Sequence, residues 1–233
     1  MKPICIIPAR GGSKGVPKKN IRKIDGKPLL GHVIEQLKKS KIFSNIVVST
    51  DDKEISRIAK KYGADVPFMR PKNLATDTTP MDAVLLHAVK ALYSMGYHFK
   101  VFVWRDATTP FIRTDDVKKS IRLLEQKKAT IVCGVYKQHL NPYFNMVERT
   151  ADGFLKLSKS LKQRPVSRQN APIVYQLNGL YAYDAIKFLK IRKTDFSQSI
   201  PLEISMETGL MIDTPFEFTI AKLLIEQKKA KLI

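Results

Sequence analysis

Short apolar runs with the length of buried strands alternate with longer segments of helical periodicity, and this alternation constrains the fold most strongly. The clearest helical segment begins at Met81 and ends near Leu92, with apolar residues recurring every three or four positions. Another helix is predicted to begin at Thr114, because Asp115 and Asp116 follow as an acidic first turn. The predicted strands are Ile4–Pro8, Asn45–Thr50, Val101–Trp104 and Ala129–Tyr136. This order predicts an α/β fold with a mostly parallel sheet and helices on both faces.

The alternation stops after Tyr136. Residues 137–172 are polar and basic, and their one compact apolar feature is LNPYFNMVE. Strand character returns over Val174–Tyr183, and a last helix is predicted over Pro215–Gln227. We therefore expect a single domain over residues 1–233, with 137–172 as an inserted segment that protrudes from it.

The chain carries 41 basic and 21 acidic residues among 233, which gives a formal net charge of +20. Such a balance fits nucleic-acid binding, or an anionic small substrate on a generally basic surface. The lysines are spread along the chain, and no arginine-rich tail, aromatic RNA-binding motif or zinc finger accompanies them. We therefore expect no dedicated nucleic-acid partner.

The apolar stretches are shorter than the roughly 18–20 residues that a membrane span needs. The N-terminal apolar run, Ile4–Ile7, leads directly into a charged loop and lacks the pattern of a signal peptide. We therefore expect no membrane association and a cytoplasmic location. The two cysteines, Cys5 and Cys133, lie in strand-like apolar runs, which predicts two buried structural thiols.

A glycine-rich, cationic loop overlaps the end of the first predicted strand, and the stretch reads IIPARGGSKGVPKKN from Ile6 to Asn20. Loops at the carboxyl ends of strands form the ligand sites of open α/β sheets. Glycines let backbone N–H groups approach an anion, and the arginine and lysines supply positive charge. The spacing matches neither the Walker A motif nor the G-x-G-x-x-G dinucleotide motif. The residues thus predict a phosphate or nucleotide loop of another kind, with a basic surface loop as the alternative.

Five further motifs accompany this loop in order along the chain. They are KIDGKPLLGHVIEQ, IVVSTDDKEI, RPKNLATDTTPMDAV, NGLYAY and IDTPFEF. Together with the loop they resemble the motifs of the CMP-sialic acid synthetases, the acylneuraminate cytidylyltransferases. The segments RDATTPFIR, NPYFNMVE and SRQNAPIVYQLNG look most similar to the branch that activates legionaminic acid. The resemblance extends over most of the chain.

The resemblance implies a Rossmann-like α/β domain that binds CTP and a nonulosonic acid, a nine-carbon acidic sugar. In such enzymes the anomeric hydroxyl of the sugar attacks the α-phosphate of CTP, and a CMP-sugar and pyrophosphate form. This chemistry needs charge neutralisation more than covalent help. The resemblance also implies Mg²⁺ or Mn²⁺ as cofactor. It implies a homodimer in which residues 137–172 form an arm that completes the partner's site.

The family's functional residues fall on named positions of this chain. By the resemblance, Arg10 and Lys19 hold the triphosphate and stabilise the leaving pyrophosphate. Asp106 contacts the sugar or accepts its proton, and Asp213 binds the metal; with Arg10 and Lys19 these are the expected catalytic residues. Arg168 is the expected partner of the sugar carboxylate. The expected nucleotide-binding set is Arg10, Gly11, Gly12, Ser13, Lys14, Lys19, Asn20, Arg70 and Thr79. The expected sugar-binding set is Asp106, Thr108, Arg168, Gln169, Tyr175, Gln176 and Asn178.

Two positions depart from the family's general pattern. Asp106 stands where sialic acid enzymes generally carry glutamine. Met211 replaces the first aspartate of an Asp-x-Asp pair that binds Mg²⁺, and Glu207 is the nearest upstream carboxylate. Mg²⁺ is commonly held by one or two carboxylates together with phosphate oxygens and water. The metal could be held by Asp213 and phosphates, Asp106 could compensate, or the chain could be slow or inactive; we expect the first.

Three alternative functions stay open at this point. A Kdo cytidylyltransferase would share the fold and the reaction, although its loop typically has Thr-Arg-Leu-Pro before Gly-Lys and lacks the Lys-Lys-Asn found here. A non-catalytic protein that binds nucleic acid or another polyanion would use the +20 charge. A degenerate enzyme retained for binding is suggested by Met211.

Overall fold

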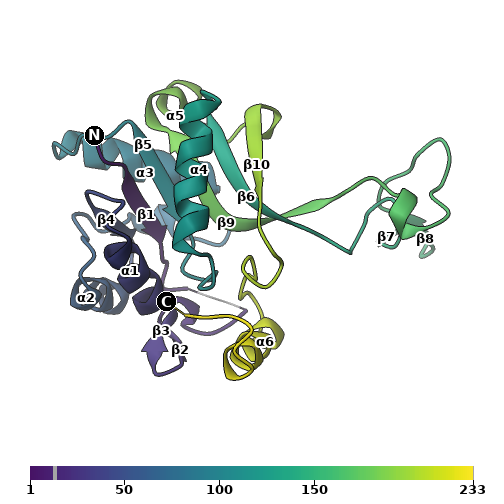
Figure 1. The fold of residues 1–233 in the computed structure, drawn as a ribbon, viewed down its shortest axis with the longest axis horizontal. Helices are drawn as coiled ribbons and strands as arrows, with labels where there is room; N and C mark the ends of the chain where they lie inside the picture. Colours follow the sequence, from purple (N-terminus) through teal and green to yellow (C-terminus); the bar gives the residue numbers. More distant parts are fainter. Residues whose placement is uncertain (13–14, 233) are drawn as a thin grey trace.

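A central mixed sheet organises the protein, whose computed structural model describes residues 1–12 and 15–232 (Figure 1). Its strands are β1 (Ile4–Pro8), β4 (Ile46–Ser49), β5 (Val101–Arg105), β6 (Ile131–Lys137), β9 (Tyr175–Asp184) and β10 (Ser199–Glu203). They lie in the spatial order β10-β6-β9-β5-β1-β4. Neighbouring strands are parallel except where β9 pairs with β5 and β6. The predicted mostly parallel α/β sheet is therefore confirmed, with one antiparallel strand.

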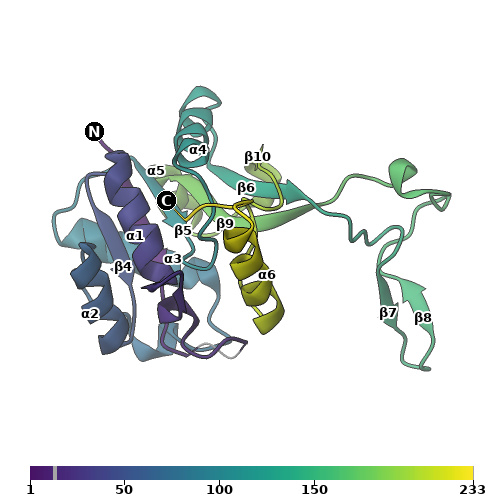
Figure 2. The ribbon, with the colours of Figure 1, turned by 60° about the horizontal axis from the view of Figure 1, so that its bottom comes forward.

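Helices cover both faces of the sheet, as predicted (Figures 1 and 2). The helices are α1 (Leu29–Ser40), α2 (Lys53–Tyr62), α3 (Met81–Ser94), α4 (Thr114–Gln126), α5 (Ala185–Ile191) and α6 (Pro215–Glu226). Buried residues of α1, α2 and α4 form one apolar cluster with the sheet, and those of α3 and α5 form another on the opposite face. Helix α6 belongs to a third, smaller cluster beside the carboxyl edge of the sheet.

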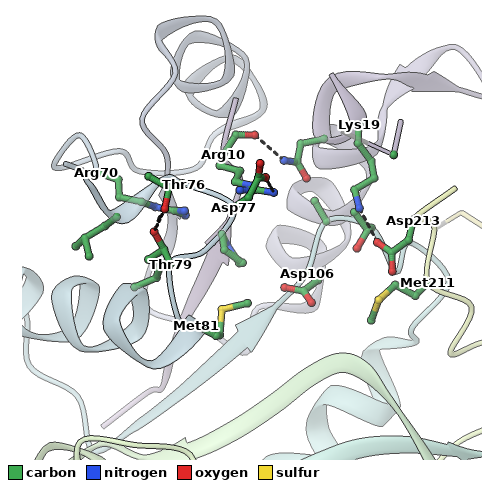
Figure 3. Close-up of a pocket in the computed structure, with 17 residues that line it drawn as sticks. Arg10, Lys19, Arg70, Thr76, Asp77, Thr79, Met81, Asp106, Met211 and Asp213 are labelled. Atoms are coloured by element: carbon green, nitrogen blue, oxygen red, sulfur yellow. Dashed lines mark hydrogen bonds and ion pairs between the residues drawn. The ribbon is translucent and has the colours of Figure 1, made fainter. Parts of the chain in front are cut away.

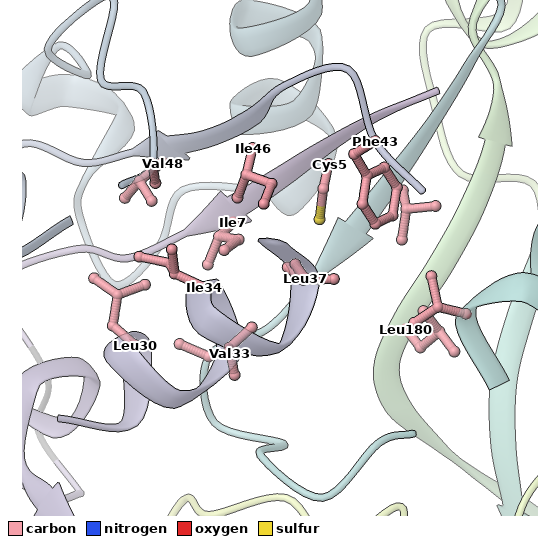
Figure 4. Packing of buried hydrophobic residues seen from close by; sticks show 14 of the residues in the cluster. Cys5, Ile7, Leu30, Val33, Ile34, Leu37, Phe43, Ile46, Val48 and Leu180 are labelled. Atoms are coloured by element: carbon pink, nitrogen blue, oxygen red, sulfur yellow. The ribbon is translucent and has the colours of Figure 1, made fainter. Parts of the chain in front are cut away.

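The continuous apolar sequence of β1 follows from the position of this strand between the two helical layers. Successive side chains of a strand point to opposite faces of the sheet. Cys5 and Ile7 therefore pack into the α1 cluster (Figure 4). Ile4 and Ile6 pack into the α3 cluster on the other face. All four side chains are fully buried. Cys133 is also buried, and both thiols are free, as the sequence predicts. None of the helices in the described ranges has the length and apolar character that a membrane span requires.

Short elements follow β1 and β4 at the carboxyl edge of the sheet. After β1 these are the 3-10 helix η1 (Lys19–Ile21) and the two-residue strands β2 (Lys23–Ile24) and β3 (Lys27–Pro28). After β4 and α2 comes the 3-10 helix η2 (Lys72–Leu74). Two more 3-10 helices, η3 (Arg168–Asn170) and η4 (Phe196–Gln198), lie later in the chain. The cationic loop and the segment around η2 thereby meet at one edge of the sheet.

Between β6 and β9 the chain leaves the body of the protein and returns, and in both views this arm extends far to one side (Figures 1 and 2). Its tip is a hairpin of β7 (Val147–Arg149) and β8 (Leu155–Leu157). Neither strand is predicted, because three residues are too few to show alternation. Strand β10 is also missed: it lies at the sheet edge and contains Pro201, and proline argues against a strand except at edges.

Candidate active site

A cavity of about 410 Å³ opens at the carboxyl edge of β1 and β5. It is lined by Pro8, Arg10, Gly15, Lys19, Asn20, Arg70, Leu74, Thr76, Asp77, Thr79, Met81, Val84, Asp106, Ala107, Thr108, Met211 and Asp213. These residues come from four separate stretches of the chain. Figure 3 shows the long side chains from these stretches converging on one space.

Arg10 anchors one side of this cavity. Its Nη2 lies 2.6 Å from a carboxylate oxygen of Asp77, which comes from the segment between η2 and α3 (Figure 3). The amide of Asn20 donates to the Arg10 carbonyl at 3.1 Å, so the two ends of the loop hold each other. Gly11 and Gly12 do not line the cavity, and the backbone N–H of Gly11 donates to Asp51. Ser13 and Lys14 lie outside the described residues.

Lys19 and Asp213 form the facing ion pair, with 2.5 Å between Lys19 Nζ and Asp213 Oδ1 (Figure 3). The loop passes very close to Asp213, because a Cβ on Gly15 would lie 2.3 Å from the Asp213 carbonyl oxygen. Only glycine fits there without displacing backbone. Lys18 behaves differently from its neighbour, since it is exposed and pairs with Glu54 at 2.8 Å. Of the adjacent lysines, only Lys19 faces the cavity.

Arg70 is buried beside the cavity and is held from behind by β4. Its Nε and Nη2 donate to the side chain and carbonyl of Ser49, at 3.2 and 2.6 Å. Burial lowers the pKa of Arg70 to about 10, which leaves it charged at neutral pH. Thr79 lies on the same side and shares a 2.7 Å hydrogen bond with the hydroxyl of Thr76 (Figure 3).

Asp106 follows the last residue of β5 and points into the cavity (Figure 3). The indole Nε1 of Trp104 donates to Asp106 Oδ1 at 3.0 Å and fixes the carboxylate. Burial raises the pKa of Asp106 to about 6, although the charge of Arg105 and the indole hydrogen bond oppose this shift. Asp106 is therefore a carboxylate that can take up a proton near neutral pH.

The metal-binding prediction rests on few ligands. Asp213 lines the cavity beside Met211, but Glu207 lines a different hollow near the C-terminus. No cluster of three or more His, Cys, Asp or Glu side chains suited to a metal occurs among the described residues. A cation that takes one or two protein carboxylates and otherwise phosphate oxygens, as Mg²⁺ does, fits this donor set.

The predicted sugar-binding residues do not gather in one place within a single chain. Only Asp106 and Thr108 line the cavity. Arg168 and Gln169 line a separate hollow of about 390 Å³ on the arm. The rest are engaged elsewhere: the Tyr175 hydroxyl donates to Glu203, Gln176 accepts from Gln138, and buried Asn178 accepts from the Leu180 N–H.

Several cavity residues were not predicted from the sequence. They include Gly15, Thr76, Asp77 and Met81. All four lie inside motifs that carry the family resemblance, so the sequence indicated the segments but not these individual residues. For Gly15, Thr76 and Asp77 the sequence does not give the direction of the side chain, since the segments around η1 and η2 have no helical or strand period. Met81 begins α3 and was predicted only as part of the apolar face of that helix.

Known proteins of similar sequence identify the family of this chain. The sequence matches the family described as Cytidylyltransferase over residues 4–230. The chain belongs to the cytidylyltransferase family. It is 36% identical over 229 residues to the post-translational flagellin modification protein B of Campylobacter coli, covering 97% of this chain and 95% of that protein. It is also 36% identical over 230 residues to the CMP-N,N'-diacetyllegionaminic acid synthase of Campylobacter jejuni, with coverage of 97% and 95%.

Among solved structures, the fold is similar to that of CMP:2-keto-3-deoxy-manno-octonic acid synthetase complexed with CTP. The TM-score is 0.71 at 18% sequence identity, covering 98% of this chain and 100% of that one. At this identity the likeness establishes the fold. The predicted membership of the cytidylyltransferases and their α/β architecture are therefore confirmed.

Proposed function

We propose that this cytidylyltransferase transfers CMP from CTP to a nonulosonic acid and releases pyrophosphate. One observation carries the proposal: a single cavity brings the cations Arg10, Lys19 and Arg70 together with the carboxylates of Asp106 and Asp213. Binding of a triphosphate requires cations such as these, and activation of a sugar hydroxyl requires a carboxylate. The legionaminic acid type of sugar is favoured, because a relative that aligns along nearly the whole chain carries that name.

The cations of the cavity would bind the triphosphate by exchanging partners. Without nucleotide, Arg10 is paired with Asp77 and Lys19 with Asp213. Phosphate oxygens can replace these carboxylates, because they offer the same charge-assisted hydrogen bonds. Arg10 and Lys19 would then neutralise the charge that accumulates on the leaving pyrophosphate. Arg70 and Thr79 would hold the nucleoside end of CTP.

Asp106 would accept the proton of the sugar's anomeric hydroxyl. The hydroxyl oxygen forms a bond to the α-phosphorus, and the bond from that phosphorus to the oxygen bridging to the β-phosphate breaks. The proton passes to the Asp106 carboxylate, and the electron pair leaves with pyrophosphate. The indole of Trp104 keeps the carboxylate in place for this transfer.

Asp213 would hold Mg²⁺ or Mn²⁺ together with triphosphate oxygens. The metal supplies charge neutralisation on the phosphates when it is bound. Because one carboxylate contributes and that carboxylate is paired with Lys19, we infer that the metal enters with the nucleotide rather than before it.

We also propose a homodimer formed through the arm. Large apolar side chains are left in solvent there, with exposed fractions of 73% for Phe154, 69% for Leu155 and 91% for Val166. Apolar surface of this kind marks an interaction site. The partner's arm would deliver the guanidinium of Arg168 to a cavity that, in one chain, is lined by only Asp106 and Thr108 of the expected sugar-binding residues. Light scattering would test the assembly: a monomeric mass at micromolar concentration contradicts this part of the proposal.

The activity is tested by a pyrophosphate-release assay with CTP, Mg²⁺ and a panel of acids: sialic, legionaminic, pseudaminic and the eight-carbon Kdo. We expect release with a nonulosonic acid and little with Kdo. Release only with Kdo would move the assignment to the Kdo cytidylyltransferases. No release with any acid, combined with tight salt-sensitive binding of duplex DNA, would instead favour the non-catalytic polyanion binder.

A further inference from the structure

Arg105 is a fully buried arginine at the end of the central strand β5. It lies two residues after Val103, which packs into the α1 cluster, so its side chain leaves the strand on that apolar face. In the parallel pairing of β1 with β5, Val103 lies opposite Cys5, which belongs to the same cluster. A fully buried position on this face of β5 would ordinarily hold an apolar side chain.

The guanidinium of Arg105 fastens the turn that follows it. Nη1 donates to the carbonyl of Asp106 at 2.8 Å and to the hydroxyl of Thr109, and Nη2 donates to the carbonyl of Thr109. The Thr109 hydroxyl in turn donates to the Asp106 carbonyl at 3.1 Å. Arg105 therefore spans both ends of the 106–109 turn.

This arrangement is costly for stability. No ion pair to Arg105 occurs among the described residues, and its Nε has no hydrogen-bond partner there. Burial lowers its pKa to about 10, so the group still carries its charge at neutral pH. The carboxylates of Asp106 and Asp116 favour this charge but form no ion pair with it. Burying a charge without a direct ion pair is unfavourable, and apolar replacements of buried charged groups are often neutral or stabilising.

The turn that Arg105 holds connects two carboxylates of the cavity, those of Asp106 and Asp213. Asp106 and Thr108 line the cavity directly. The carbonyl of Thr108 accepts a 2.8 Å hydrogen bond from the N–H of Ile212, the residue before Asp213. A shift of this turn would therefore move Asp106 and the Asp213 segment together.

We propose that Arg105 is a positioning residue, which fixes the 106–109 turn so that Asp106 and Asp213 face the same cavity. The proposal rests on the proposed cytidylyltransfer reaction, in which both carboxylates act. It assigns to Arg105 a role in geometry at the expense of stability. Such a trade is expected at functional sites and unexpected in a core that serves folding alone.

The test replaces Arg105 by methionine, which keeps an unbranched side chain and removes the charge and all donors. We expect Arg105→Met to fold with a Tm equal to or above that of the unmodified protein, while kcat/KM for pyrophosphate release falls at least tenfold. Arg105→Lys keeps a charge but cannot span the turn with a planar fork, so it should also lose activity. A control, Phe188→Leu, changes a buried residue on the opposite sheet face and should lower Tm with little change in kcat or KM.

Hydrogen exchange provides a readout that is independent of activity. Peptides covering residues 106–113 and 211–213 should exchange faster in Arg105→Met, with the rest of the sheet unchanged. A lowered Tm with unchanged kinetic constants would show that Arg105 is merely structural, and unchanged exchange at the turn would overturn the positioning role. If the unmodified protein releases no pyrophosphate with any sugar acid, the proposed function fails, but the exchange comparison still decides whether Arg105 orders the turn.

Discussion

The cavity and the arm differ in whether their long side chains have partners within the same chain. Among the described residues, the long cations that line the cavity are held by groups of the same chain: Arg10 by Asp77, Lys19 by Asp213 and Arg70 by Ser49. The arm has a two-stranded hairpin at its tip and leaves large apolar side chains exposed. The cations of the cavity thus have their partners within one protomer, whereas the arm leaves apolar surface that the proposed homodimer would cover.

This difference separates the two substrates of the proposed reaction. The predicted nucleotide-binding residues come from the loop after β1 and from the segment between α2 and α3, whose start pairs with the chain directly after β4. Parallel strands bring their carboxyl ends to one edge, so residues distant in sequence meet without further help. The predicted sugar-binding residues of the arm have no such frame. Substitutions in each region test whether the cavity and the arm serve different substrates.

The largest effect is expected in the cavity, from Arg10→Ala. Loss of a charge-assisted donor to a developing anion lowers turnover by about 100-fold or more. The rate of pyrophosphate release should fall by that amount, with the Tm little changed. Lys18→Ala is the matched control, because this loop lysine is exposed and pairs with Glu54 outside the cavity. Turnover of Arg10→Ala near that of the control would remove Arg10 from the catalytic set.

The next largest effect is a pH dependence set by Asp106. Its pKa is raised by burial to about 6, and the proposed proton acceptor is the deprotonated form. Activity should therefore be full above pH 6 and fall about tenfold per pH unit below it, because protonation removes the acceptor. A pH–rate profile for kcat/KM measures this. Asp106→Asn should be slow at every pH and lack the inflection near 6; an inflection that persists in the variant belongs to another group.

The two regions also differ in how far the sequence predicts them. The strand preceding the cationic loop is a continuous apolar run, and Ile4–Pro8 is predicted to the residue. The ion pair of Lys19 with Asp213 joins positions 194 residues apart and follows from no local pattern. Asp106 is found only because the resemblance marks its strand end. The arm hairpin is missed because three-residue strands are too short to show alternation.

A smaller effect is expected on the arm, from Arg168→Ala. If the partner's arm supplies this guanidinium to the sugar carboxylate, the KM for the sugar acid should rise about tenfold, as for loss of one hydrogen bond to a charged group. The KM for CTP should stay constant, because the nucleotide residues lie in the cavity of one chain. Arg149→Ala in the arm hairpin is the control. Equal rises in both KM values would contradict the division of the substrates between the two regions.

The smallest expected effect concerns Met211, the position at which the cavity itself is incomplete. Met211→Asp would place a second carboxylate beside Asp213 and should lower the Mg²⁺ concentration for half-maximal activity by a few fold, because Mg²⁺ uses one or two protein carboxylates. Isothermal titration without CTP should then detect Mg²⁺ binding that the unmodified protein lacks. Met206→Asp, on the separate arm hollow, is the control. Mg²⁺ binding by the unmodified protein in the absence of CTP would contradict entry of the metal with the nucleotide. It would show that side chains of the protein bind the metal without phosphate oxygens.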